Sequence, residues 1–222
     1  GELGIHGYNH QPLVPPGYQN DEPDYVPWQN EDDMEEALTE INRYVHEAFP
    51  KYKFRAYVPP SNILSPQGRE AILESLPDIR ILSSLYDGSA EEEAYYQEFQ
   101  REENGVYDIP RITAGYNPTG LDLYFECTVI TSIGVFNHFV HPDELFYEES
   151  KDKTWHMMKE GLQEFLKQID SRYGWLTAVT ASESLPYFDS YFNLDYRVLR
   201  KPDELEIHCW NYTHEASFLL RS

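Results

Sequence analysis

The first strong pattern in the chain is a helical repeat of apolar positions. It begins after Asn30 or Asp32, either of which can serve as the helix N-cap, and acidic residues fill the first turn. Pro50 ends it, because proline cannot continue a helix. The pattern predicts an amphipathic helix over 30–49. Its apolar positions are Met34, Leu38, Ile41, Val45 and Phe49.

A strand, a helix and a second strand follow within about 35 residues. Residues 54–58 form the first predicted strand and 79–85 the second. Between them, Ser65 supplies an N-cap and Pro66 a proline at the first helical position of a helix over 66–75. This alternation is typical of parallel α/β architecture rather than of a β-sandwich.

The remaining pattern predicts further α/β pairs and then an antiparallel C-terminal segment. The last three predicted strands follow one another with only turns between them. In order, the predicted elements are a helix over 90–103, strands over 106–112 and 134–141, a helix over 151–172, and strands over 175–179, 194–199, 205–210 and 216–220.

Composition and charge exclude several classes of protein. The chain has 222 residues and a net charge of -22, the wrong sign for gripping a phosphate backbone, so nucleic acid is not an expected partner. No apolar run approaches the roughly 18 residues of a membrane-spanning helix. Cys127 and Cys209 are too few for a disulfide scaffold, although one disulfide stays open. The 18 tyrosines suit sugar faces, or they fill half-buried positions in a β-rich secreted domain.

The first candidate site is the pair His6 and His10. The two imidazoles stand four residues apart, and Gly7 between them allows a sharp backbone turn. Such a pair can close on one cation, and neutral imidazoles favour zinc or a similar borderline metal. The alternative is that the spacing is coincidental.

The second candidate is His141, at the end of the strand predicted over 134–141. Side chains alternate along a strand, so His138 and His141 should face opposite sides. Pro142 ends the strand, which favours His141 as the group at the rim of a pocket. In the alternative interpretation both histidines are structural and satisfied by hydrogen bonds.

The third candidate is Arg55, on a predicted strand that runs into Pro59 and Pro60. It can orient a carboxylate or form a structural ion pair, and the sequence does not distinguish the two. The chain contains no Gly-x-Ser-x-Gly elbow, phosphate-binding glycine loop or dinucleotide fingerprint. Serine hydrolases, kinases and Rossmann dehydrogenases therefore lack support.

In their order, these features resemble the motifs of the NodB-type polysaccharide deacetylases of carbohydrate esterase family four. The run from Glu2 to His10 resembles the family's histidine-pair motif, Arg55 with its prolines resembles its arginine motif, and His141 resembles its late strand-end histidine. The runs 137–144 and 172–177 resemble more specifically a divergent branch that includes deacetylase domains of Pel-type exopolysaccharide biosynthesis.

The resemblance implies an α/β fold: a distorted (β/α) barrel over 1–190, incomplete at its N-terminus, with a C-terminal β-strand appendage over 191–222. It implies an extracellular or periplasmic hydrolase that removes acetyl groups from a polysaccharide of N-acetylated amino sugars, using a divalent metal, usually zinc. His6 and His10 would be metal ligands, His141 the general acid, Arg55 the group that orients the base, and Tyr57, Tyr116 and Trp175 the sugar platform.

One motif of the family is absent from this chain. The family's third metal ligand and its catalytic base are aspartates on a strand before the histidine pair, whereas the chain begins five residues before His6. The adjacent aspartates Asp32 and Asp33 lie at a helix start, where they complement the helix dipole. We therefore expect an upstream segment of the same precursor to supply the aspartates. The alternatives are a non-catalytic carbohydrate-binding or scaffold domain of this fold, and a standalone zinc hydrolase completed by Asp143.

Overall fold

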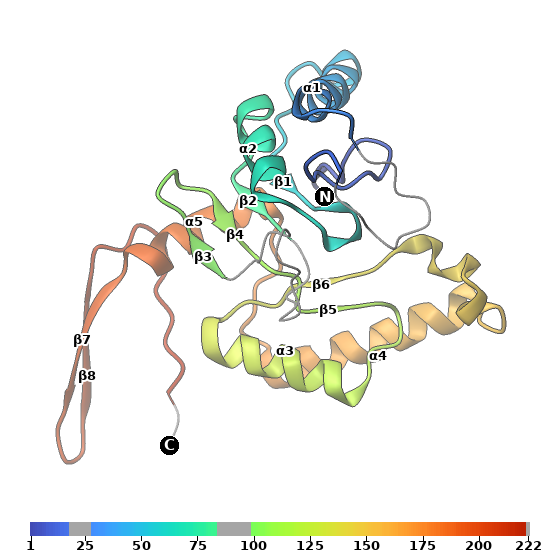
Figure 1. The fold of residues 1–222 in the computed structure, drawn as a ribbon. Coiled ribbons are helices and arrows are strands. Elements are labelled where there is room, and N and C mark those ends of the chain that lie inside the picture. The colour runs from blue at the N-terminus through green and yellow to red at the C-terminus, as the bar shows by residue number, and fades with distance from the viewer. Residues whose placement is uncertain (18–27, 84–98, 221–222) are drawn as a thin grey trace. The chain divides into compact units, whose positions relative to one another are not determined.

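A computed structural model describes the protein over residues 1–17, 28–83 and 99–220 (Figure 1). It contains two compact units, which are described separately. The larger unit is Leu3–Thr177, and the smaller one combines Gly1–Glu2 with Ala178–Ser222. The division therefore falls at Thr177, earlier in the chain than the boundary near residue 190 that the sequence suggests.

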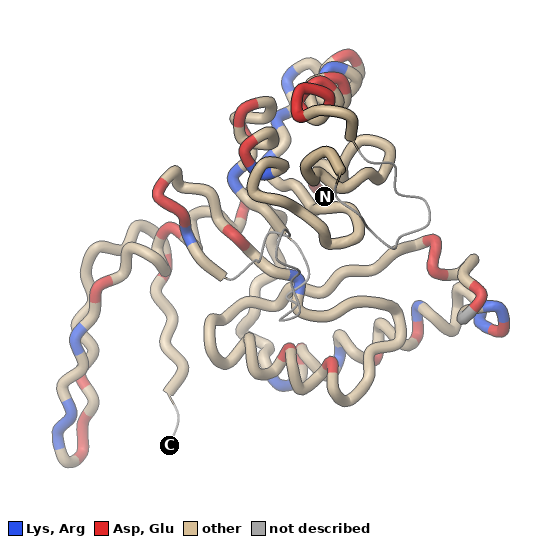
Figure 2. The backbone as a smooth tube through the Cα atoms, viewed as in Figure 1, with Lys and Arg blue, Asp and Glu red and all other residues tan. Residues whose placement is uncertain are grey.

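Helix α1, Glu31–Ala48, confirms the predicted first helix. The Asn30 side chain caps it by accepting a hydrogen bond from the Asp33 amide at 2.9 Å. Acidic residues fill the first turn and continue along the exposed side (Figure 2). Met34 and Leu38 are buried on the opposite side. The helix thus packs one apolar stripe on the core, as the spacing of its apolar residues predicts.

A four-stranded sheet lies at the centre of the larger unit, in the order β1-β2-β4-β3. Strands β1, β2 and β4 are parallel, and β3 runs antiparallel to β4. Helix α2 connects β1 to β2, which confirms the predicted strand-helix-strand unit. The bounds are β1 Ala56–Tyr57, α2 Pro66–Ser75, β2 Ile81–Leu82, β3 Gln100–Arg101 and β4 Tyr107–Asp108.

The helix predicted over 90–103 falls largely outside the described residues. Its last part is wrong, because Gln100 and Arg101 form strand β3. Gly105, at a φ of 79°, sits in the turn that leads from β3 into β4. The predicted break at Gly105 is therefore a hairpin turn rather than a helix end.

A second, two-stranded parallel sheet pairs β5, Thr113–Ala114, with β6, His138–Phe139. Helix α3, Gly120–Ile133, connects these strands, and α4, Trp155–Tyr173, follows and confirms the helix predicted over 151–172. The two helices share a core of Ile130, Phe165 and Ile169. Short 3-10 turns complete the unit, namely η1 Pro60–Asn62, η2 Pro142–Phe146 and η3 Glu148–Ser150.

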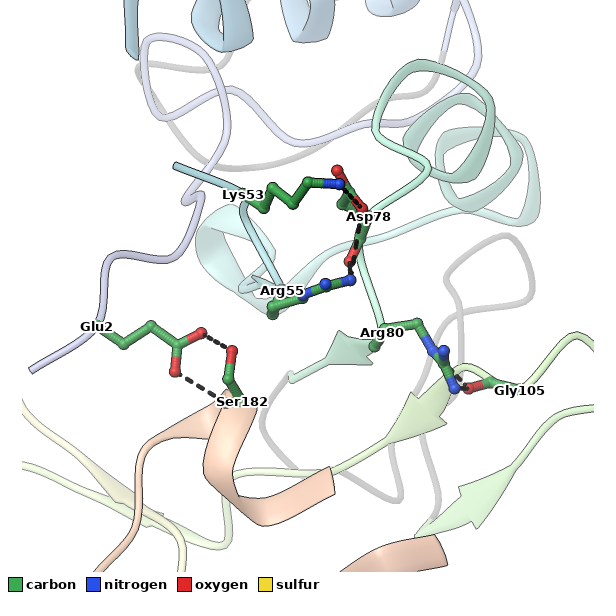
Figure 3. Close-up of polar contacts among 7 residues, drawn as sticks. All are labelled: Glu2, Lys53, Arg55, Asp78, Arg80, Gly105 and Ser182. Atoms are coloured by element: carbon green, nitrogen blue, oxygen red, sulfur yellow. Dashed lines mark hydrogen bonds and ion pairs between the residues drawn. The ribbon is translucent and has the colours of Figure 1, made fainter. Parts of the chain in front are cut away.

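The smaller unit contains α5, Ala181–Asn193, and a hairpin of β7, Asp195–Arg200, and β8, Leu205–Trp210. The Glu2 carboxylate accepts hydrogen bonds from the Ser182 amide at 2.8 Å and hydroxyl at 2.6 Å, at the N-terminal turn of α5 (Figure 3). The hairpin confirms two predicted strands. The strands predicted over 175–179 and 216–220 are wrong, since neither segment pairs with another strand.

Among the described residues the strands form three separate sheets, and none of them closes into a barrel. The distorted barrel therefore stays a prediction. Within the same residues, no helix combines the length and the apolar character needed to cross a membrane.

The tight packing of Gly68 against the Leu13 backbone predicts a large effect for a small substitution. A Cβ atom added to Gly68 in α2 would lie 2.1 Å from the Leu13 carbonyl oxygen, which also accepts hydrogen bonds from Ser65. We expect Gly68→Ala to lower the free energy of unfolding by about 1–3 kcal/mol, because the backbone of one segment must move. Gly120→Ala is the matched control, since a Cβ at Gly120 meets no atom within 4 Å. Equal urea midpoints for the two variants would contradict the prediction.

Candidate functional site

The candidate site lies where parallel strands of the larger unit end. Ile5 pairs in parallel with Tyr57 of β1: its amide donates to the Ala56 carbonyl at 3.0 Å, and its carbonyl accepts from the Val58 amide at 2.8 Å. Ile5 therefore extends the sheet beyond β1. His6 follows at the carboxyl edge of the strands, which is where α/β proteins collect their functional groups.

His6 and His10 come together as their spacing predicts, with ring centroids 4.9 Å apart and the rings edge to face. The loop between them turns back through left-handed backbone at Gly7, Asn9 and His10, with φ values of 70°, 53° and 57°. A Cβ at Gly7 would lie 2.5 Å from Pro60 Cγ, so only glycine fits there. Backbone of this kind is costly and concentrates at functional sites.

The hydrogen bond of His6 fixes which of its nitrogens is free. Nδ1 lies 2.8 Å from the Val58 carbonyl oxygen, which can only accept, so Nδ1 carries the hydrogen. Burial lowers the pKa of His6 against the raising effect of this hydrogen bond, and nearby His10, Arg111 and His141 lower it further. Neutral His6 then offers the Nε2 lone pair, with the orientation that carbonyl-bonded histidines have in metal sites.

The donor set of the pair fits part of a metal site. Two neutral imidazoles match zinc, but a catalytic zinc site has three protein ligands. Over residues 1–17, 28–83 and 99–220, no group of three or more histidine, cysteine, aspartate or glutamate side chains is arranged to hold a metal. The pair alone therefore falls one protein ligand short of a catalytic zinc site.

Arg111 is a member of the site that the sequence analysis missed. It follows β4 after Pro110, is only 5% exposed, and donates through Nη2 to the Asn62 side-chain oxygen. Its guanidinium carbon lies 4.0 Å from the centre of the Phe139 ring. Burial lowers the pKa of Arg111 to about 10.

Among the residues that the structure describes, the charge of Arg111 has no counterion. No aspartate or glutamate of the described residues forms an ion pair with it, and its buried Nε has no hydrogen-bond partner. A buried guanidinium with an open donor is costly unless an anion meets it. Among the described residues of the larger unit, acidic residues lie along α1 and α2, in the turn between β3 and β4, and in the η2 and η3 turns (Figure 2).

His141 completes what we call the histidine-arginine cluster, which consists of His6, His10, Arg111 and His141. Its ring lies 5.0 Å from the ring of Phe139, the residue on which Arg111 stacks. Its side chain is 40% exposed, and Nδ1 is 3.9 Å from a Glu144 oxygen. The cluster therefore combines a buried cation, the half-buried imidazoles of His6 and His141, and the exposed imidazole of His10.

His138 has different surroundings from His141. Its Nδ1 lies 2.7 Å from the Thr113 hydroxyl, its Nε2 2.8 Å from the Gly115 carbonyl, and its ring packs on Phe165 of α4. These are the satisfied hydrogen bonds of a structural histidine.

Arg55 lies at the other end of β1 from the cluster. It precedes Ala56, and its guanidinium contacts the carbonyl and carboxylate of Asp78 at 3.1 and 3.5 Å (Figure 3). Lys53 joins the same carboxylate at 3.1 Å. The structure thus contains the structural ion pair that the sequence left open, and it brings Arg111 rather than Arg55 to the histidines.

The three aromatic residues predicted as a sugar platform are not brought together. Tyr57 is a residue of β1 whose side chain is fully buried in the core, and its hydroxyl has no hydrogen-bond partner. Tyr116 is 4% exposed and packs on Trp155. Trp175 is half exposed and contacts Tyr173. A ring that is fully covered cannot stack on a sugar, which corrects the assignment of Tyr57 and leaves Trp175 as the accessible one.

A groove beside the histidine loop contains two aromatic residues that the sequence analysis missed. It measures about 500 Å³ and is lined by Tyr8 and Trp28 together with carboxylates of α1. Trp28 is fixed by a 2.7 Å hydrogen bond to the Pro12 carbonyl. Tyr8 lies in sequence between His6 and His10, so the groove and the cluster share one loop.

Comparison with known proteins identifies a family. Residues 1–222 match DUF2194, which is described as an uncharacterised protein conserved in bacteria. The chain belongs to this family. No curated protein and no solved structure matches it. The resemblance to NodB-type deacetylases therefore stays a prediction that rests on the motifs.

Proposed function

We propose that this DUF2194 chain belongs to a metal-dependent hydrolase that removes acetyl groups from a polysaccharide of N-acetylated amino sugars. The observation that supports it best is the meeting of His6 and His10 with Arg111 and His141 at the ends of parallel strands. The motif resemblance adds the reaction class. As exopolysaccharide modification, the reaction would take place outside the cytoplasm, in the extracellular space or the periplasm.

His6 and His10 would hold a divalent metal, with zinc the best match to neutral imidazoles. When bound, the metal supplies polarisation of the acetamide carbonyl and a lowered pKa of the attacking water. The 2.8 Å bond from His6 Nδ1 to the Val58 carbonyl orients the ring for this task.

The third ligand and the base would be aspartates carried by a strand beside Ile5. Among the described residues the segment around Ile5 pairs only with β1, through the Ile5 amide and carbonyl, so the backbone groups of Gly4 and His6 on its other side can accept a further parallel strand. Such a strand would end next to His6. Arg111 would pair with one of the carboxylates on that strand, taking the role that the resemblance assigns to Arg55, because its buried charge meets no anion within the described ranges.

His141 would give its proton to the leaving amine. Histidine is the side chain whose charge changes near neutral pH, and this ring is accessible to a substrate. The neighbouring groove would hold a sugar of the polymer against Tyr8 and Trp28. The polymer would thus run along the loop that carries the metal ligands.

Metal binding tests this proposal most directly. We expect His6→Ala and His10→Ala each to lower zinc affinity by at least about 10–100-fold, measured by competition with a chromogenic chelator. His156→Ala is the control, since His156 lies on α4 with a side chain that is 79% exposed. Zinc affinity that falls equally in all three variants, or in none, would argue against the site. The native polypeptide should be assayed beside residues 1–222, because a strand with aspartates should raise affinity.

A second candidate is a carbohydrate-binding or scaffold domain of the same fold. It is favoured by one observation, that no carboxylate of the described residues joins His6 and His10 in a metal site. Polymer binding without zinc uptake or acetate release by the native polypeptide would select it. A site completed by Asp143 is less favoured, because Asp143 is exposed and accepts a hydrogen bond from Tyr147 at 3.3 Å.

A further inference from the structure

A hydrogen-bonded chain of three side chains lies between α3 and the β5–β6 sheet. Thr113 Oγ1 is 2.5 Å from Glu126 Oε1 and 2.7 Å from His138 Nδ1. Glu126 and Thr113 are buried, at 0% and 3% exposure, and Glu126 Oε2 has no partner. The mechanism proposed above does not use these residues.

The number of protons in this chain follows from donors and acceptors. His138 Nε2 lies 2.8 Å from the Gly115 carbonyl, so Nε2 carries a hydrogen. If His138 is neutral, its Nδ1 must accept the Thr113 hydroxyl proton. The short contact from Thr113 to Glu126 then requires a proton on Glu126. If Glu126 is ionised instead, it accepts the Thr113 proton, and Nδ1 of His138 must carry a hydrogen.

Both arrangements contain one acidic proton, on Glu126 or on His138. With no such proton, one of the two short contacts joins two lone pairs. With two, either the Thr113 hydroxyl hydrogen has no acceptor or the carboxyl hydrogen sits on Glu126 Oε2, which has no partner, and in both cases a net positive charge is buried. One proton is therefore the count that satisfies all the contacts.

We propose that Glu126, Thr113 and His138 share a single proton. At mildly acidic to neutral pH this proton maintains the hydrogen bonds that connect α3 to the β5–β6 sheet. Strand β6, which contains His138, leads to His141, so these hydrogen bonds also stabilise the base of the loop that carries His141. Loss of the proton at higher pH leaves an uncompensated carboxylate in the core and weakens the connection between α3 and the β5–β6 sheet.

The electrostatic surroundings agree with one shared proton. Burial raises the pKa of Glu126 to about 7, against the lowering effects of its contacts with Thr113 and with the Asn137 backbone. Burial also lowers the pKa of His138. The charged groups that act on the pair are Asp122 of α3 and Glu144 beyond β6, and both are acidic. From α4 the neighbour of His138 is the uncharged ring of Phe165.

The sign of the pH dependence follows by linkage. Between about pH 4.5 and 6.5, the ordinary values for the two groups, the unfolded chain holds one proton on this pair, and the folded chain does too. The pair then adds no pH dependence to stability. Above that range the unfolded chain loses the proton first, so stability falls as pH rises through about 7. Below it the unfolded chain gains a second proton, so stability falls as pH drops.

Urea unfolding of three variants between pH 4.5 and 8 tests the proposal, with Glu126→Gln/His138→Gln as the baseline. Relative to this baseline, the free energy of unfolding of the wild type should stay constant from about pH 4.5 to 6.5. Glu126→Gln alone should lose stability as pH falls below 6.5. His138→Gln alone should lose on the order of 100-fold in its folding equilibrium constant as pH rises from 4.5 to 7. If the stability of each single variant depends on pH in the same way as that of the double variant, the proposal is overturned.

Wild-type spectra decide the question if a variant fails to fold. The Glu126 carboxyl carbon and the His138 ring nitrogens, followed by NMR, should show no step between about pH 4.5 and 6.5, and one proton should leave above that range. A separate titration of Glu126 near 4.5 or of His138 near 6.5 would refute a shared proton.

Discussion

Replacing His141 with alanine is expected to lower turnover of an acetylated amino-sugar polymer by about 10²–10⁴-fold while bound zinc stays unchanged. The reason is position: His141 lies near His6, yet its side chain is accessible and belongs to a different strand end from the metal pair. A group that gives a proton to the leaving amine affects turnover without holding the metal. The measurement is acetate release by the native polypeptide, with metal content determined on the same samples.

The control for His141 is His46→Ala, which removes a histidine of α1 that is bonded to the Asn42 carbonyl. It should leave both turnover and zinc unchanged. Equal loss of zinc and activity in His141→Ala would make His141 a ligand instead of an acid. Unchanged turnover would remove it from the mechanism.

Elements with strong local signals were predictable from the sequence, and elements stabilised by packing were not. Helix α1 has an N-cap, acids in its first turn and one apolar stripe, and its predicted bounds nearly match. Helix α3 was missed because its own apolar residues lie on all sides of the helix, so the sequence shows no single apolar stripe. As a result, Leu121, Tyr124 and Phe125 remain exposed. Helix α5 has Pro186 in its interior, which predicts a break. In both helices, the capping boxes at Thr119 and Thr180 were usable signals.

The candidate site likewise contains one contact that the local sequence predicts and one that depends on the fold. The pairing of His6 with His10 depends on a short loop, and spacing with Gly7 predicted it. The meeting of Arg111 with Asn62 joins residues 49 positions apart and depends on the order of β1, β2 and β4 in the sheet. Sequence does not reveal that order. One local signal was available: Arg111 lies beside a proline near the end of a predicted strand, as His141 does.

Arg111→Met is expected to raise the stability of the larger unit by about 1 kcal/mol or more while lowering turnover by at least about 100-fold. Methionine fills a similar volume and removes a buried charge that has no counterion among the described residues. The loss of the Asn62 hydrogen bond and of the stacking on Phe139 reduces this gain. The free energy of unfolding and acetate release are the two measurements.

Arg111→Lys separates charge from geometry. Lysine keeps the charge but not the planar fork that can hold a carboxylate with two hydrogen bonds, so turnover should recover only in part. The pH profile tests positioning itself, because a guanidinium beside the base lowers the pKa of that base. Without Arg111, the acidic limb of kcat/KM should move to higher pH. A purely structural arginine would give the reverse result: Arg111→Met would unfold at lower urea concentration, and the acidic limb would not move. Opposite changes in stability and activity are the mark of a residue retained for its function.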